Sequence, residues 1–127
     1  MNRASRAASM AALVVLSAAG AADRPPEVSL AGKGIRVKFN QAMHSRVFAR
    51  LPNGEIALGD FTPSEIIRVS GKEVTDFTLS GSGRKPVADR IGRGVRWVVR
   101  SAAGSLVKTV TLTFYDEFPR MAFFDVE

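Results

Sequence analysis

The sequence predicts an all-β chain that folds as an antiparallel β-sandwich, and two observations carry this prediction. Turn signals rich in glycine, asparagine, serine and proline recur about every ten residues, which is the spacing of antiparallel sandwiches and barrels. The segments between these turns alternate apolar and polar residues or concentrate β-branched and aromatic residues, and both patterns favour strands. At 127 residues, the chain has room for one domain.

The first 22 residues are set apart from the rest by their composition. A basic start at residues 1–6 precedes an apolar run at residues 7–16 and a set of small residues, of which Ala19-Gly20-Ala21 matches an A-x-A cleavage site. The pattern predicts a helical signal peptide over residues 1–22 and export to the periplasm or the extracellular space. A retained membrane anchor is the alternative, but the apolar run is shorter than the about 20 residues that a spanning helix needs.

The predicted domain starts after this leader. Residues 23–26 are typical of a linker, since Pro25 and Pro26 keep the backbone extended. Residues 27–127 form the sandwich domain. The chain has no cysteine, so the exported domain has to be held together by its core or by a neighbouring domain, without disulfides.

Four strands are expected in the first half of the domain. Residues 27–30 and 35–39 flank a glycine turn, and the strict alternation of residues 35–39 indicates one buried and one wet face. Residues 43–51 form the third strand. Asn53-Gly54 then predicts a type I′ hairpin turn, because both residues accept positive φ, with a return strand at residues 55–58.

The middle of the chain contains two ambiguous segments. Residues 64–69 have an N-cap and a proline that could open a helix, but their β-branched residues favour a strand, which we adopt. A strand at residues 73–79 follows, and the Ser-Gly repeat at residues 80–83 predicts a flexible connection. Residues 85–91 are expected to form an extended edge, where Pro86 is tolerated.

The C-terminal part predicts a strand at residues 95–100 and then a hairpin. Residues 106–115 form its first strand, residues 116–119 its turn and residues 121–126 its second strand. The sequence stops at Glu127, directly after that strand and without a polar tail. We therefore expect a sandwich that is truncated at its C-terminus.

The formal net charge of +6 is a mild excess, because two of the arginines belong to the leader. The basic residues of the domain concentrate in one segment, where they alternate with apolar residues. This pattern favours a solvated strand face, or a strand edge protected from aggregation, over a nucleic-acid interface. The segment contains Arg84, Lys85, Arg90, Arg93, Arg96 and Arg100.

No set of residues predicts a catalytic or metal centre. His44 is the single histidine, and without cysteine it is a thin basis for a zinc site or a catalytic triad. The glycines lack the spacing of a phosphate-binding loop. Asp116 and Glu117 are adjacent carboxylates in a predicted turn, where stabilising the turn is the commoner role. We therefore expect no catalytic residue, no metal and no cofactor.

Two aromatic residues are candidates for stacking against a sugar. Tyr115 ends a predicted strand and is expected to be partly exposed. Trp97 is in phase with Val95 and Val99, so burial in the core is the stronger expectation for it. Tyr115 and Trp97 are the carbohydrate-binding residues that the sequence proposes.

Several segments of the domain resemble the N-terminal region of bacterial exported α-galactosidase-like (melibiase-type) glycoside hydrolases. The resemblance implies a β-sandwich that precedes a (β/α)8 barrel, and the barrel carries the two catalytic aspartates. No residue of this sequence matches those aspartates, so the implied partners are carbohydrate and a catalytic barrel domain that this sequence lacks. The segments are residues 43–50, 58–61, 74–79, 106–110 and 115–122.

Three functions follow from these observations. The first is a non-catalytic N-terminal sandwich of a secreted α-galactosidase-like hydrolase, with no nucleic-acid partner and no membrane contact after the leader is removed. The second is a self-standing exported carbohydrate-binding or adhesive module. The third is an enzyme in its own right, for which the sequence offers no site.

Overall fold

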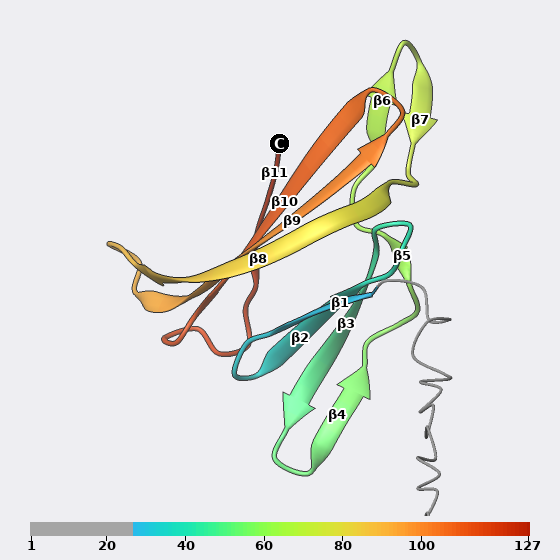
Figure 1. Cartoon of the computed structure of the whole chain (residues 1–127). Coiled ribbons are helices and arrows are strands. Elements are labelled where there is room, and N and C mark those ends of the chain that lie inside the picture. Colours follow the sequence, from blue (N-terminus) through green and yellow to red (C-terminus); the bar gives the residue numbers. More distant parts are fainter. Residues whose placement is uncertain (1–26) are drawn as a thin grey trace, which may run out of the picture.

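The computed structural model describes residues 27–127, so the predicted signal peptide (1–22) and linker (23–26) lie outside the described residues. This part of the chain is all-β, and every strand pairing in it is antiparallel, as predicted (Figure 1). Residues 27–127 contain no helix that is long and apolar enough to span a membrane. The strands are β1 (Val28–Ala31), β2 (Ile35–Phe39), β3 (His44–Leu51), β4 (Gly54–Ala57), β5 (Thr62–Pro63), β6 (Ile67–Val69), β7 (Lys72–Val74), β8 (Thr78–Ala88), β9 (Arg93–Ala103), β10 (Leu106–Tyr115) and β11 (Phe123–Val126).

The strands form two main sheets and one small hairpin. The N-terminal sheet has the order β1-β2-β3-β4, and β5 also pairs with β3. The C-terminal sheet has the order β11-β10-β9-β8, and within residues 27–127 β6 pairs with β7 alone. Figure 1 shows the two main sheets as separate layers. Strands that are neighbours in sequence are mostly neighbours in space, as in most antiparallel sheets.

The core lies between the two main sheets, which gives the chain a sandwich-like architecture. Alternation turns one face of β1, β2, β9 and β10 toward this core. On β2 the expected buried face is confirmed, since Val37 and Phe39 are buried. Both sheets and two connecting residues contribute to the central cluster of Leu30, Val37, Phe39, Met43, Phe77, Val99, Val110, Leu112 and Phe114.

One core position on β10 carries a charge. Lys108 is in phase with Val110 and Leu112, and its side chain is 1% exposed. Its ammonium group pairs with the carboxylate of Glu65, in the segment before β6, and lies 4.0 Å from the ring centre of Phe77. A buried charge needs such partners, because desolvation strongly disfavours an isolated ion. The pair ties the β5–β6 connection to the C-terminal sheet.

The predicted strand at residues 73–79 and the predicted flexible connection at residues 80–83 are both wrong. The first is broken at residues 75–77, where the Phe77 amide donates to the Ala42 carbonyl and the chain passes to the C-terminal sheet. Residues 80–83 belong to β8, which pairs along the whole of β9 with a bulge between Leu79 and Gly81. A long partner strand supplies the hydrogen bonds that the local sequence did not indicate. The edge expected at residues 85–91 is confirmed as far as Ala88, with Pro86 on the edge strand β8, whereas residues 89–91 form the β8–β9 turn.

The β3–β4 hairpin is present, but its turn differs from the prediction. Leu51 pairs with Gly54, so the two-residue loop is Pro52-Asn53, and the return strand starts at Gly54. Only Gly54 takes a positive φ, of 139°, whereas Asn53 does not. The pyrrolidine ring of Pro52 locks φ near −65°, which excludes a type I′ turn with Pro52 at its first central position.

The remaining predicted strands are confirmed with small shifts of their ends. The strand predicted at residues 64–69 is present only over Ile67–Val69 (β6), since residues 64–66 belong to no strand, and the C-terminal hairpin is β10 and β11. Its connection is longer than predicted and runs from Asp116 to Ala122. In the described residues, β11 pairs with β10 alone and forms the second edge of the C-terminal sheet.

Candidate functional site

A groove of about 560 Å³ lies on the face of the C-terminal sheet that points away from the core. We call it the outer groove. The alternation that buries Leu112 and Phe114 turns Thr111, Thr113 and Tyr115 to this opposite face. Side chains from all four strands and from the β8–β9 turn line the groove: Lys85, Ile91, Arg96, Val98, Thr111, Thr113, Tyr115, Phe123, Phe124 and Asp125.

The strand registers arrange this face in rows that cross the sheet from β8 to β11. One row consists of Lys85, Arg96, Thr113 and Phe123. The next row consists of Gly83, Val98, Thr111 and Asp125. No heavy atom lies within 4 Å of where a Cβ on Gly83 would be, so the β8 end of the second row is open.

Tyr115 forms part of the groove floor and is held by a polar network. Its hydroxyl donates to Asp89 Oδ2 at 2.7 Å, and its ring contacts Phe123 edge-on, with ring centres 5.1 Å apart. Arg96 joins the network, with Nη2 3.6 Å from the same Asp89 oxygen, while its Nε donates to Thr113 at 3.0 Å. The network therefore fixes the guanidinium of Arg96 over the sheet.

The Asp89–Tyr115 hydrogen bond lowers the pKa of one group and raises the pKa of the other. The hydroxyl of Tyr115, followed by the amides of Ile91 and Gly92, holds the pKa of Asp89 below its ordinary value. The same hydrogen bond, with burial, raises the pKa of Tyr115. At neutral pH the groove therefore contains an ionised Asp89 and a protonated Tyr115.

Replacing Tyr115 with phenylalanine is expected to remove a stabilising contribution that depends on pH. Because the pKa of Asp89 is lowered on folding, this contribution is lost as pH falls below about 4 through the folded pKa. Because the pKa of Tyr115 is raised, the contribution is complete below about pH 10 and is lost as pH rises through the folded pKa. Urea unfolding of both proteins should show a constant stability difference at about pH 5–9 that shrinks on either side. A difference that does not vary with pH would contradict the assignment.

The structure separates the two aromatic residues that the sequence proposed for sugar binding. The expected partial exposure of Tyr115 is wrong: its side chain is buried, 4% exposed, because Phe123 and the β8–β9 turn cover it. Trp97 pairs with the buried Leu112 and packs against the core, as expected. Its Nε1 is buried and has no hydrogen-bond partner in the described residues. Tyr115 and Trp97 lie on opposite faces of the sheet and cannot form one stacking platform.

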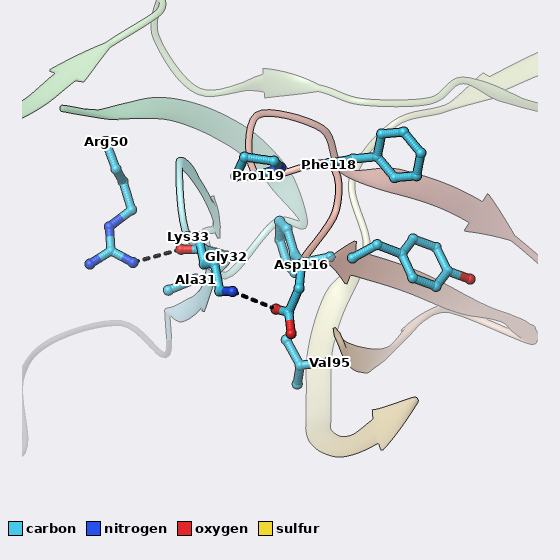
Figure 2. A pocket seen from close by; sticks show the side chains of 10 residues that line it. Ala31, Gly32, Lys33, Arg50, Val95, Asp116, Phe118 and Pro119 are labelled. Carbon is cyan, nitrogen blue, oxygen red and sulfur yellow. Dashed lines mark hydrogen bonds and ion pairs between the residues drawn. The ribbon is translucent and has the colours of Figure 1, made fainter. Parts of the chain in front are cut away.

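A second pocket, of about 260 Å³, lies where the β1–β2 turn meets the β10–β11 connection. Figure 2 shows Lys33 paired with Asp116 at 3.3 Å and Arg50 donating to the Gly32 carbonyl at 2.6 Å. The Gly34 amide also donates to the Pro119 carbonyl at 2.7 Å. These polar groups form ion pairs and hydrogen bonds with one another. The contacts join the ends of the two sheets, and the pocket offers few free polar groups to a ligand.

The other candidate residues have structural partners. His44 Nε2 lies 2.7 Å from an oxygen of Asp76, and residues 27–127 contain no group of three potential metal ligands. Glu117 accepts from the Arg93 amide, so Asp116 and Glu117 both stabilise the chain around their turn. The basic residues are divided between the two faces of the C-terminal sheet. Lys85, Arg96 and Arg100 share the outer face, whereas Arg84 lies over Trp97 on the opposite face.

Sequence reasoning missed most residues of the outer groove. The alternation of residues 106–115 was enough to place Thr111, Thr113 and Tyr115 on one face. The rows of Lys85 with Arg96 and of Thr111 with Asp125 follow from strand registers, which the sequence did not predict.

Comparison with known proteins adds no assignment, since no protein-family model, no curated protein and no solved structure matches the chain. The resemblance to α-galactosidase-like hydrolases stays a prediction based on sequence motifs.

Proposed function

We propose that the chain is a non-catalytic, carbohydrate-binding β-sandwich module of an exported α-galactosidase-like glycoside hydrolase. One observation carries the binding role: the outer groove gathers cations, a carboxylate, threonine hydroxyls and the ring of Phe123 on the outer face of the sheet. The leader pattern of residues 1–22 supports export, and the motif resemblance supports the enzyme class.

The side chains of the groove suit the chemistry of a sugar. A pyranose presents hydroxyls that donate and accept hydrogen bonds, and an apolar face that packs on aromatic or aliphatic surface. Thr111 and Asp125 accept hydrogen bonds, and the anchored guanidinium of Arg96 donates them. Phe123 and Val98 supply apolar contacts beside them. Polar groups placed beside apolar surface are typical of small-molecule sites.

Calorimetric titration with galactose-containing oligosaccharides tests the proposal, with Gly83→Leu as the informative variant. The new side chain would fill the open end of the second row, so we expect saturable wild-type binding that weakens at least about tenfold, or about 1.4 kcal/mol. Ser82→Leu is the matched control, since residue 82 is next to Gly83 but on the opposite face. A folded wild-type protein that binds none of these sugars would overturn the binding role.

The same groove also fits the second function, a self-standing exported carbohydrate-binding or adhesive module. The coding sequence of the gene after Glu127 distinguishes these two functions. A reading frame that continues beyond Glu127 into a (β/α)8 barrel with two catalytic aspartates supports the hydrolase module, and a stop codon there with no barrel-coding sequence downstream favours the self-standing module.

A further inference from the structure

The outer groove has two cations directly opposite each other at its β8 end. Lys85 and Arg96 are register partners on adjacent strands and point to the same face. Like charges in this position repel and destabilise a sheet. Within residues 27–127, Lys85 forms no ion pair, and the carboxylate nearest to Arg96 is Asp89, at 3.6 Å from Nη2. Two positive charges therefore stand against the single negative charge of Asp89.

The other charges around the groove leave this imbalance in place. Asp89 is already engaged by the Tyr115 hydroxyl and by the amides of Ile91 and Gly92. Asp125 lies one row away and two strands from Arg96, which corresponds to about 12 Å between their Cα atoms. The groove is therefore polarised, with positive charge at β8 and β9 and negative charge at β11.

We propose that the outer groove takes an acidic oligosaccharide, whose sulfate or carboxylate group binds between Lys85 and Arg96. This inference rests on the proposed function and adds the substrate class. A bound anion would relieve the repulsion between the two cations, and the planar fork of Arg96 suits a two-oxygen acceptor. Neutral hydroxyls of the next sugar would donate to Asp125, where a second anionic group would be repelled.

The arrangement of charges favours an acidic sugar over a nucleic acid. A polyphosphate backbone carries an anion at every nucleotide and is bound by cations along its whole track. Here Arg100 adds one more cation on β9, but the two rows after Lys85 and Arg96 end on the β11 side at Asp125 and at Glu127, the pairing partner of Thr109. The cations lie on the β8 and β9 side and the carboxylates on the β11 side, which suits a ligand with isolated acidic groups.

Calorimetry with three oligosaccharides of equal length tests the inference: a neutral galactoside, a sulfated galactoside and a galacturonide. We expect at least one acidic sugar to bind about tenfold or more tightly than the neutral one, a preference that falls as salt is raised. The sulfated and carboxylated arms distinguish the two anion types. Lys85→Gln should abolish the preference, whereas Arg84→Gln, whose side chain lies over Trp97 on the other face, should preserve it.

The outcomes separate this inference from the proposed function. Equal affinity for neutral and acidic sugars, unchanged by Lys85→Gln, would overturn the proposal that the ligand is acidic. The proposed carbohydrate-binding role would still hold. No binding to any of the three sugars would overturn both. Tighter binding to a single-stranded oligonucleotide of matched charge than to either acidic sugar would also overturn the inference. Circular dichroism of each variant confirms that the compared proteins are folded.

Discussion

Replacing Glu65 with glutamine is expected to lower the free energy of unfolding by about 3–5 kcal/mol, because it leaves the ammonium group of Lys108 buried without a counter-ion. Lys108 is 1% exposed, so water cannot take over the role of the carboxylate. The ring of Phe77, at 4.0 Å, offers the cation a contact but no hydrogen bond. A domain of this size has about 5–15 kcal/mol in total, so the variant is expected to be marginal or unfolded.

Urea unfolding followed through the fluorescence of Trp97, the single tryptophan, measures this loss. The double variant Lys108→Met with Glu65→Gln should recover most of the stability, since replacing a buried ion pair with apolar groups is often neutral. Lys33→Met is the control, because Lys33 and Asp116 form an exposed pair that contributes about 1 kcal/mol or less. If Glu65→Gln and Lys33→Met have the same effect, the buried pair is not a stabilising contact.

Replacing Gly94 with alanine is expected to cost at least about 3 kcal/mol through steric overlap with the neighbouring strand. Gly94 pairs with Tyr115, and a Cβ at this position would lie 1.9 Å from the carbonyl oxygen of Phe114. That oxygen belongs to the backbone of β10, so relief requires the β9–β10 ladder to separate. The shift would also displace Tyr115 from Asp89 and disturb the outer groove.

Gly83→Ala is the matched control, since its Cβ would meet nothing within 4 Å on the same face of the same sheet. Substitution there should be neutral or should stabilise the protein by up to about 1 kcal/mol, because alanine has less freedom in the unfolded chain. The urea concentrations at the unfolding midpoints of the two variants are compared with each other. Equal midpoints would show that the sheet accepts a side chain at residue 94 and would contradict the steric argument.

Local pattern was enough to predict much of this fold. The alternation of residues 35–39 gave both the strand and the face that it buries, and the apolar, β-branched run of residues 106–115 gave the strand. Pro86 correctly indicated an edge, because a residue without an amide hydrogen is tolerated where no second neighbour is needed. The wrong predictions have different causes: Pro52 excludes the type I′ turn locally, whereas tertiary contacts decided residues 80–83 and the burial of Tyr115. Residues 80–83 have weak strand preference, and β9 imposes their conformation on them.

The sequence alone determined which side chains of a strand share a face, because successive residues of an extended backbone point to opposite sides. The tertiary structure decided which residues of different strands become neighbours. Glu65 meets Lys108 and Lys85 meets Arg96 through packing and register, and the register of β8 on β9 includes a bulge at Leu79 and Gly81. These contacts join residues distant in the chain, so no local pattern encodes them. The core ion pair and the charge of the outer groove therefore exist only in the folded molecule.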